Sequence, residues 1–410
     1  MRRPVKKQLP ITLPLLRDAV TMFLQSYDNK TYSEKKPCPK CGSENVIKSG
    51  GTQPKIFCRI ITKTGFKDIT VRIKRLQCKN CKTSFYAQAP FYKNCIYSTL
   101  IVDLCLALAA NMPRNRAEAT LTELGIQVDR DTIKNYCKLF RKRAEKYAGL
   151  SFLGADLAIN VLKILTGAEN VEQLRDKLPE KGKEIIPATA DETYPAKKGA
   201  KKKQKEENQK RKKEGKKPLL HPEGFTLAAA YLPTLKIFAS LCVQDMDFNH
   251  LLALMLMQPL KGTDYVVVDG EPSYNGTCNN LKRCTIHRRR RIARKDPQLQ
   301  ELRKNDPNTY LKGYRSLHDY LKEDFYKELE KEIGKPPPEG LPTSTNSMEG
   351  GNWREKHALD TSYWTVEGLR DRALLLCLRD SLKTFSGGKP VENPVVQMGH
   401  FSYGLIMAAV

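Results

Sequence analysis

The 410-residue sequence lacks long hydrophobic runs and has few acidic residues relative to basic ones. No stretch reaches the roughly 20 apolar residues that a membrane-spanning helix needs, so we expect no membrane partner. The apolar segment Gly404–Val410 is far too short. The basic N-terminus is not followed by an apolar core with a small-residue cleavage site, so no secretory signal is expected. These absences predict a cytoplasmic protein.

The charge balance is strongly positive. There are 71 lysine and arginine residues against 45 aspartate and glutamate residues, a formal net charge of +26. Such an excess says little about the fold but indicates a polyanionic partner, most often nucleic acid. A basic ribosomal protein or a membrane-surface protein is the competing interpretation of composition alone.

The 12 cysteines include two closely spaced pairs. Without a secretory signal, paired cysteines favour a metal site over disulfides. Cys38 and Cys41 form one C-x-x-C turn, and Cys78 and Cys81 form the other, with alternating β-type sequence between them. Two such turns supply the four thiolates of one structural Zn²⁺ ion. We therefore predict a zinc ribbon over residues 37–90, after an N-terminal helix within residues 1–36. A redox role is less favoured because the pair is duplicated.

Residues 95–150 show helical periodicity. The pattern predicts one helix ending near Met112, a second ending at Gly125 as a C-terminal cap, and a third capped by Asp129 or Asp131. This order is typical of a helix-turn-helix DNA-binding domain. A purely structural helical bundle is the alternative. The residues predicted to contact DNA from the third helix are all basic: Arg130, Lys134, Lys138 and Arg141.

Two strand-like segments of the C-terminal half end in carboxylates. Asp191 lies near the end of the first, and Asp269 directly follows the run Tyr265–Val268. Carboxyl ends of strands are where open α/β sheets place their sites. Glu349 stands just before a later helical pattern. We predict that these three acids hold two Mg²⁺ or Mn²⁺ ions, because hard cations prefer carboxylate ligands. Glu192 is the rival to Asp191, since neighbours on a strand point to opposite faces.

Two segments interrupt the predicted catalytic domain, which covers residues 183–385. Residues 197–217 are dominated by lysine and predict a mobile loop, either simply solvated or able to clamp phosphate. Residues about 292–332 are expected to form a helical insertion, and a C-terminal tail is expected at 386–410.

Several motifs together resemble those of DDE-type insertion-sequence transposases, in the broad region near the Mutator-like families. Asp191–Tyr194 resembles the first-aspartate motif, and Val268–Gly270 with Ser273 and Tyr274 resembles the second. Cys284–His287, followed by the basic run Arg288–Arg291, resembles the C-x-x-H element of Mutator-like enzymes. Asn346–Gly350 resembles the signature of the last catalytic helix. The likeness covers about half of the chain, roughly residues 183–385.

The resemblance implies a multidomain α/β protein with a ribonuclease-H-like catalytic core and a helical insertion, preceded by the β zinc ribbon and the all-α helix-turn-helix domain. It implies metal-dependent cleavage and strand transfer of DNA by Asp191, Asp269 and Glu349. The expected partners are double-stranded DNA, both element ends and target, and further copies of the chain, with a location at the nucleoid. A zinc-ribbon regulator or an inactive transposase-derived protein is the alternative. Further residues expected to contact DNA are His287, Arg288, Arg289, Arg290, Asn346 and Asn352. For His287, a purely structural role is the competing interpretation.

Overall fold

The computed structural model describes thirteen stretches of the chain, and two compact units are recognised in it. The described residues are 14–148, 158–180, 183–197, 199–219, 223–245, 247–284, 287, 301, 304–305, 341–342, 344–345, 365–382 and 403–408. Unit 1 comprises Met1–Arg143 together with Ser402–Val410, and unit 2 comprises Ala144–Phe401. The chain is therefore a multidomain protein of mixed α/β structure, as predicted.

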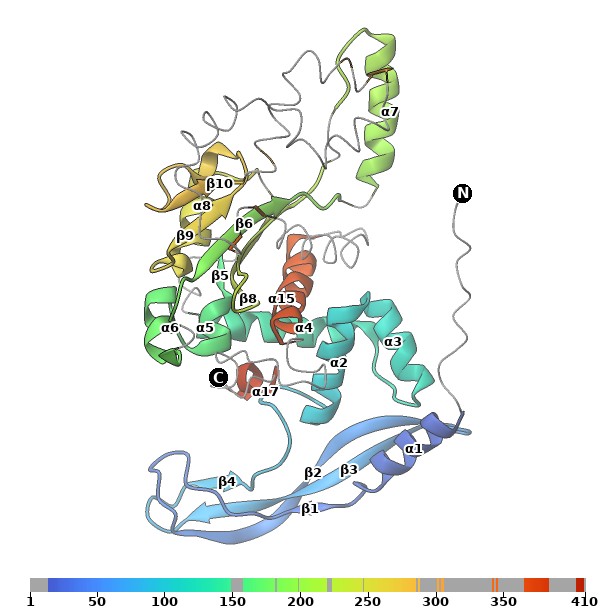
Figure 1. The fold of residues 1–410 in the computed structure, drawn as a ribbon. Coiled ribbons are helices and arrows are strands. Elements are labelled where there is room, and N and C mark those ends of the chain that lie inside the picture. Colours follow the sequence, from blue (N-terminus) through green and yellow to red (C-terminus); the bar gives the residue numbers. More distant parts are fainter. Residues whose placement is uncertain are drawn as a thin grey trace. The chain divides into compact units, whose positions relative to one another are not determined.

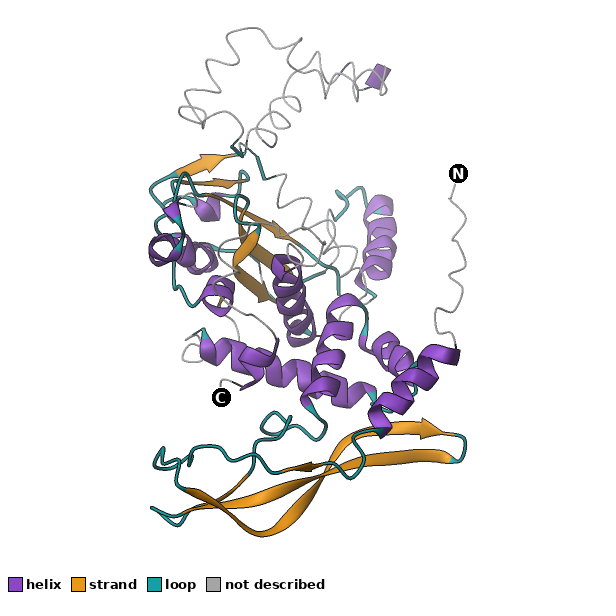
Figure 2. Ribbon diagram, turned by 60° about the horizontal axis from the view of Figure 1, so that its bottom comes forward, coloured by secondary structure: helices purple, strands orange, loops and turns teal. Residues whose placement is uncertain are grey.

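Unit 1 begins with helix α1 (Pro14–Gln25) and then a β-sheet. Its main feature is a long antiparallel hairpin of β2 (Val46–Thr62) and β3 (Gly65–Cys78), flanked by the short strands β1 (Thr31–Tyr32) and β4 (Ser84–Tyr86) (Figure 2). The β-branched segments between the cysteine pairs predicted strands, and these are confirmed in longer form. Phe57, Ile60 and Ile69 are buried at the turn-proximal half of the hairpin, where Phe57 also stacks on Tyr27 at 4.3 Å between ring centroids.

Three helices follow in unit 1, as the sequence predicted. They are α2 (Thr99–Asn111), α3 (Arg114–Glu123) and α4 (Arg130–Tyr147), the last of which continues into unit 2 from Ala144. Gly125 ends α3 with a φ of 80°, a left-handed conformation that glycine adopts without strain. Asp129, not Asp131, caps α4: its two carboxylate oxygens accept bonds of 2.7 Å from the Thr132 backbone nitrogen and from the Thr132 hydroxyl.

The C-terminal segment contributes to unit 1 rather than forming a separate tail. Helix α17 (Tyr403–Ala408) contacts α2, and Ile406 and Met407 are buried. The ring of Tyr403 packs edge-on against Phe140, and Arg143 donates to the Met407 carbonyl. The apolar side chains of α17 therefore form part of the core of unit 1.

Unit 2 contains a six-stranded sheet in the order β10–β9–β6–β7–β8–β5 (Figure 1). The strands are β5 (Ile159–Asn160), β6 (Pro187–Thr193), β7 (Thr226–Leu232), β8 (Ile237–Gln244), β9 (Tyr265–Val268) and β10 (Leu281–Arg283). β6, β7 and β8 are antiparallel neighbours, whereas β9 is parallel to both β6 and β10. The prediction missed β5 and β10, which are too short to show a period.

Helices pack against this sheet and explain why its central strands are continuously apolar. α15 (Val366–Leu382) and α5 (Val161–Thr166) lie against β8, and α8 (His250–Met257) contacts β7 and β8 (Figure 1). Backbone polar groups are satisfied across these contacts, because Ser381 accepts from the Phe238 amide at 3.1 Å. α6 (Val171–Lys177) completes the helices before β6.

The lysine-rich segment after β6 is not a loop. It forms helix α7 (Ala200–Lys213), with only Ala200 buried. The physical reason is propensity: Lys, Arg, Gln and Glu are all good helix formers, and no glycine or proline interrupts Ala200–Lys213. The low complexity of the segment argued correctly against a core but wrongly against a helix. The predicted insertion at 292–332 lies almost entirely outside the described residues.

Candidate functional site

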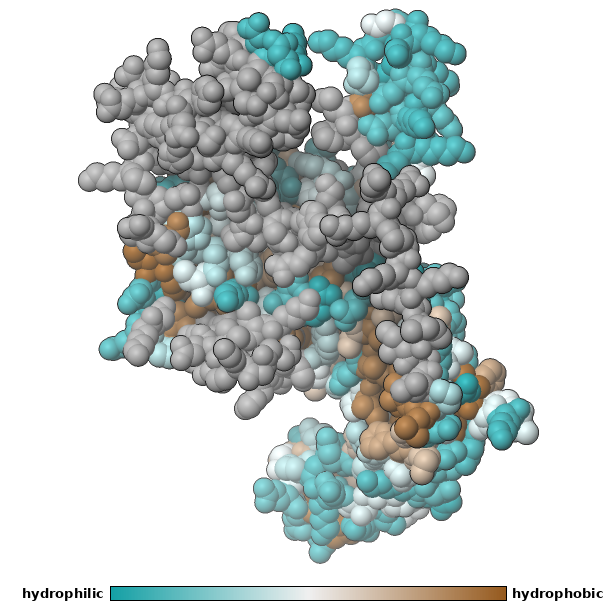
Figure 3. Space-filling model, turned by 45° about the vertical axis from the view of Figure 1, so that its right-hand side comes forward, coloured by the Kyte–Doolittle hydropathy of each residue, from teal (hydrophilic) through white to brown (hydrophobic). Residues whose placement is uncertain are grey.

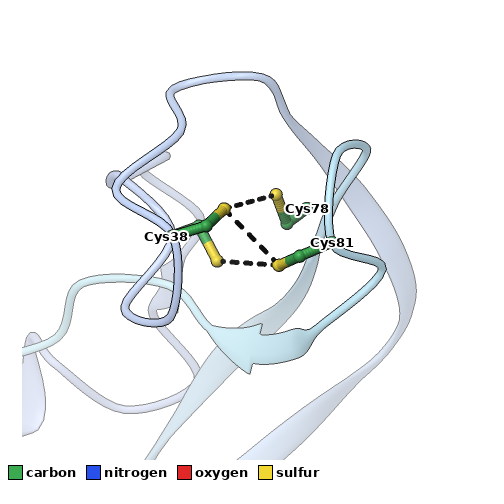
Figure 4. Close-up of side chains that lie close together, drawn as sticks. Cys38, Cys78 and Cys81 are labelled. Atoms are coloured by element: carbon green, nitrogen blue, oxygen red, sulfur yellow. Dashed lines mark hydrogen bonds between the residues drawn. The ribbon is translucent and has the colours of Figure 1, made fainter.

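Four cysteines converge at one end of the hairpin in unit 1. The Sγ atoms of Cys38, Cys41, Cys78 and Cys81 all lie within 4.8 Å of one another. Cys81 Sγ is 3.5 Å from both Cys38 and Cys41, and Cys41 Sγ is 3.6 Å from Cys78 (Figure 4). Four thiolates at this spacing could hold a structural metal such as zinc. The predicted ligand set is therefore brought together in full.

The two cysteine pairs have matching local structure. In each, the residue after the second cysteine adopts a left-handed conformation, Gly42 at a φ of 71° and Lys82 at 59°. Each first cysteine also donates its backbone N–H to a carbonyl five residues on, Cys38 to Ser43 and Cys78 to Thr83. These turns direct the sulfurs of one pair toward those of the other.

The surroundings of Cys81 favour its thiolate. The Thr83 hydroxyl, 3.2 Å from Sγ, lowers the pKa of Cys81 to about 6, and the Thr83 backbone acts in the same direction. A thiolate, not a thiol, is the form that binds metal. Thr83 was not singled out by the sequence, although a hydroxyl two residues after a cysteine is a readable signal.

In unit 2, the sheet brings Asp191 and Asp269 to neighbouring positions. β6 and β9 pair in parallel with Ala190 opposite Val268, so the next residue of each chain is the predicted aspartate. Parallel neighbours in register direct their side chains to the same face of a sheet. Two acids that are far apart in sequence therefore meet at the carboxyl ends of adjacent strands.

A wider set of acidic and phenolic groups surrounds this pair. Glu192 is largely buried, and its burial together with the negative charge of Asp269 raises the pKa of Glu192 to about 8. Tyr274, whose side chain is fully buried, donates a hydrogen bond of 2.9 Å to Glu192 Oε2. The negative charges of Asp191 and Glu271 also act on Glu192. Several acidic groups therefore lie near one another at the carboxyl ends of β6 and β9.

The turn after Asp269 is fixed by its own hydrogen bonds. Asp269 Oδ1 accepts from the Glu271 amide at 2.7 Å, and Arg283 donates to the Asp269 carbonyl at 2.7 Å. Glu271 Oε1 in turn accepts from the amide and the hydroxyl of Ser273. Tyr274 was predicted only as part of the second-aspartate motif. No sequence pattern indicated Glu271, because a residue of the turn after a strand shows no periodicity.

The carboxylates are less tightly grouped than the cysteines. Within the described part of the chain, the four cysteines are the one group of three or more potential ligands whose donor atoms lie within 4.8 Å of one another. Uncompensated carboxylates repel one another, and this repulsion adds to burial in raising the pKa of Glu192. Glu349, the third predicted acid, lies outside the described residues.

Helix α4 presents basic side chains along one face. Arg130, Lys134 and Lys138 are exposed and four residues apart, so they lie on the same side of the helix. Arg141, which was predicted to contact DNA with them, is buried, with 4% of its surface exposed. It falls on the side of Cys137 and Phe140, which form the buried stripe. Lys142 continues the exposed face instead.

The C-x-x-H element makes local contacts with Thr345. Cys284 is buried, and its sulfur lies 3.4 Å from the Thr345 amide that donates to it. His287 Nδ1 lies 3.5 Å from the Thr345 hydroxyl, and hydrogen bonding from His287 contributes to lowering the pKa of Cys284 despite its burial. The other residues predicted to contact DNA lie outside the described part of the chain: Arg288, Arg289, Arg290, Asn346 and Asn352.

Comparison with known proteins leaves the site to be interpreted from its own chemistry. No protein-family model matches the chain, and no curated protein matches it significantly. Among the described residues, no helix combines the length and apolarity required to cross a bilayer.

Proposed function

We propose that the chain is a DDE-type DNA transposase whose catalytic acids are Asp191, Asp269 and Glu349. The observation that carries this proposal is the pairing of β6 with β9, which brings Asp191 and Asp269 to neighbouring positions. The third acid rests on the sequence resemblance alone.

The sheet supports a ribonuclease-H-like core. When β6 is counted as the first strand, β7 and β8 are the second and third, and neighbours among these three are antiparallel. β9 and β10 are the fourth and fifth strands; they lie on the other side of β6 and run parallel to it. The first strand is thereby central, and its neighbour is the fourth. An acid from each of these two strands then lies at the carboxyl end of the sheet, as a two-carboxylate site requires.

The donor chemistry fits hard divalent ions. Carboxylates are the protein ligands that Mg²⁺ and Mn²⁺ prefer, and a cation would relieve the repulsion that, together with burial, raises the pKa of Glu192. When bound, two such ions activate the attacking oxygen and stabilise the leaving oxygen of a phosphodiester. Asp191 and Asp269 would hold them, and the hydrogen bond from the Glu271 amide orients the Asp269 carboxylate.

Unit 1 would supply DNA binding. We assign the four cysteines to a zinc ribbon with one structural Zn²⁺, and α2, α3 and α4 to a helix-turn-helix domain in which Arg130, Lys134 and Lys138 face the groove. Because both are complete without the carboxylates, unit 1 also favours a second candidate, a DNA-binding regulator derived from a transposase. The acids at the carboxyl ends of β6 and β9 distinguish the transposase from the regulator, since a protein that only binds DNA does not need them.

Metal-dependent nicking tests the enzyme. We expect the chain to nick duplex DNA carrying the flanking ends of its element with Mg²⁺ or Mn²⁺, and to join the 3′ ends to a target. The Asp191→Asn, Asp269→Asn and Glu349→Gln variants should lose this activity by at least about 100-fold, as is typical when a group acting at the transition state is removed, while still binding DNA.

Asp176→Asn is the matched control, because Asp176 is an exposed acid on α6 of the same unit. It should nick like the unmodified chain. Full nicking by Asp269→Asn would remove that residue from the site and refute the assignment of the carboxylate triad. Binding without nicking under all metal conditions would favour the regulator.

A further inference from the structure

Helix α7 is the most basic element of the described chain. Its sequence contains eight lysine and arginine residues and two glutamates, a net charge of +6. It begins nine residues after Asp191 on the same chain segment, between β6 and β7. Figure 3 shows a mostly hydrophilic surface over this helix at the upper right. A helix with no apolar face is not held in place by a core.

One side of α7 is instead fixed by the chain that follows it, residues 214–219, which we call the return segment. Gln204 and Asn208 donate side-chain hydrogen bonds to the Leu219 carbonyl, and Asn208 Oδ1 accepts from the Leu219 amide. Arg211 donates to the Lys217 carbonyl. These residues share one side of the helix. The insertion is thus an ordered hairpin of helix and extended chain.

The base of this hairpin is anchored to the sheet. Lys197 lies 2.8 Å from Glu223 and 2.7 Å from Asp245, so one ammonium joins the two ends of the insertion to the end of β8. Ala196 and Gly224 form an isolated β-bridge beside it. The helix therefore extends from a fixed base on the strand that carries Asp191.

The side of α7 opposite the return segment carries Lys202, Lys205, Lys210 and Lys213, all exposed. At 1.5 Å per residue, Lys202 and Lys213 are about 16 Å apart along the axis, which corresponds to roughly five base-pair steps of duplex DNA at 3.4 Å each. Glu206 lies on this side and contacts Lys202 at 3.9 Å, an exposed pair that offsets little of the charge.

The distribution of charge is unfavourable for the helix alone. Its first turn holds Lys201, Lys202 and Lys203, no acidic residue, and no side-chain cap. The helix dipole disfavours cations at this end, and neighbouring lysines repel one another. A polyanion along the outer side would compensate both effects.

We infer that the outer side of α7, formed by Lys202, Lys205, Lys210 and Lys213, binds the phosphate backbone of duplex DNA without regard to base sequence. This inference rests on the proposed function and deepens it, because it assigns to the catalytic unit a DNA contact separate from that of unit 1. Lysine is suited to this role as a point charge that reads phosphate and not bases.

The test is the salt dependence of DNA binding by the full chain without divalent ions, so that catalysis does not enter. Each neutralised phosphate contributes about −0.9 to the slope of log K against log salt on B-DNA. Replacing the four lysines by glutamine should reduce the magnitude of that slope by about 2–4 on a duplex of random sequence. Glutamine preserves helix propensity, and circular dichroism should show unchanged helix content.

The matched control replaces four other exposed lysines of unit 2 by glutamine: Lys177, Lys183, Lys236 and Lys261. It removes the same charge and should change the slope by less than about 1, through the general field of the protein. An α7 variant with an unaltered slope, or a control that loses as much, would refute the α7 assignment and leave the nicking result untouched. A full chain that binds no duplex DNA would overturn both proposals.

Discussion

At the scale of single residues, the raised pKa of Glu192 can be tested by measuring how the stability of unit 2 depends on pH. Its pKa is raised from 4.5 to about 8 by burial and by the charge of Asp269. A carboxyl group with a raised pKa in the folded state contributes stability that is fully present below pH 4.5 and is lost as pH rises toward 8. At 1.36 kcal/mol per pKa unit, the loss is up to about 5 kcal/mol in the absence of divalent ions.

We therefore expect Glu192→Gln to abolish most of this fall, since glutamine keeps the shape and can still accept the hydrogen bond from Tyr274. The measurement is the urea midpoint of unit 2 between pH 5 and pH 8.5, with Glu184→Gln as the exposed control on the same unit. A parallel decline in the two variants would show that the Glu192 carboxyl ionises freely.

The choice between Asp191 and Glu192 shows what a sequence pattern can supply. Strand alternation predicted that the two carboxylates point to opposite faces, and the pairing of Ala190 with Val268 puts Asp191 in register with Asp269. The pattern could not predict that Glu192 would be buried against Tyr274, because that contact depends on how the chain turns after β9. Long-range contacts of turn residues leave no local signal.

At the scale of elements, the β2–β3 hairpin divides into two halves with different support. The half near its turn is held by the fully buried Ile60 and Ile69, whereas the half near the cysteines has only the small cluster of Val46, Ile73, Leu76 and Ala87. Stability there should depend on bound metal, since a structural zinc site contributes to folding directly.

Removing zinc with a chelator should therefore increase amide hydrogen exchange at Ile47 and Phe85 while Ile60 remains protected. Cys81→Ser should lose the zinc and show the same exchange without chelator. Cys58→Ala, which removes a buried cysteine outside the ligand set, should keep one zinc per chain. If chelation leaves exchange at the cysteine end unchanged, the four sulfurs do not hold a structural metal.

Helix α7 shows where composition misleads at this scale. Low complexity and high charge predicted correctly that the segment buries almost nothing, and propensity alone would have predicted the helix. The order of the insertion comes from Gln204 and Asn208 binding the Leu219 backbone, eleven or more residues away. By contrast, α2, α3, α4, α8 and α15 were predictable because each has an apolar stripe or run with recognisable ends.

At the scale of the whole molecule, most elements were predictable but their assembly was not. The hairpin of β7 and β8 joins neighbours in sequence, so its pairing follows from the chain. The parallel pairing of β9 with β6 spans the entire α7 insertion and was inferred only through resemblance to a known order of elements. The short edge strands β5 and β10 take their structure from the neighbouring strand, which no local pattern records.

The return of the C-terminus to unit 1 is the strongest case of this kind, and it predicts which part of the protein depends on it. Ile406 is 1% exposed in α17, a helix of six residues that could not persist alone. Ile406→Ala should cost unit 1 about 2–4 kcal/mol, as truncation of a buried aliphatic side chain does. Hydrogen exchange should accelerate in α2 and α4, while β7 and β8 of unit 2 keep their protection. Ala408→Ser, at an exposed position of the same helix, should change neither. Equal loss of protection in β7 would mean that the two units unfold as one, and the last residues of the chain would then stabilise the sheet of unit 2 as well as unit 1.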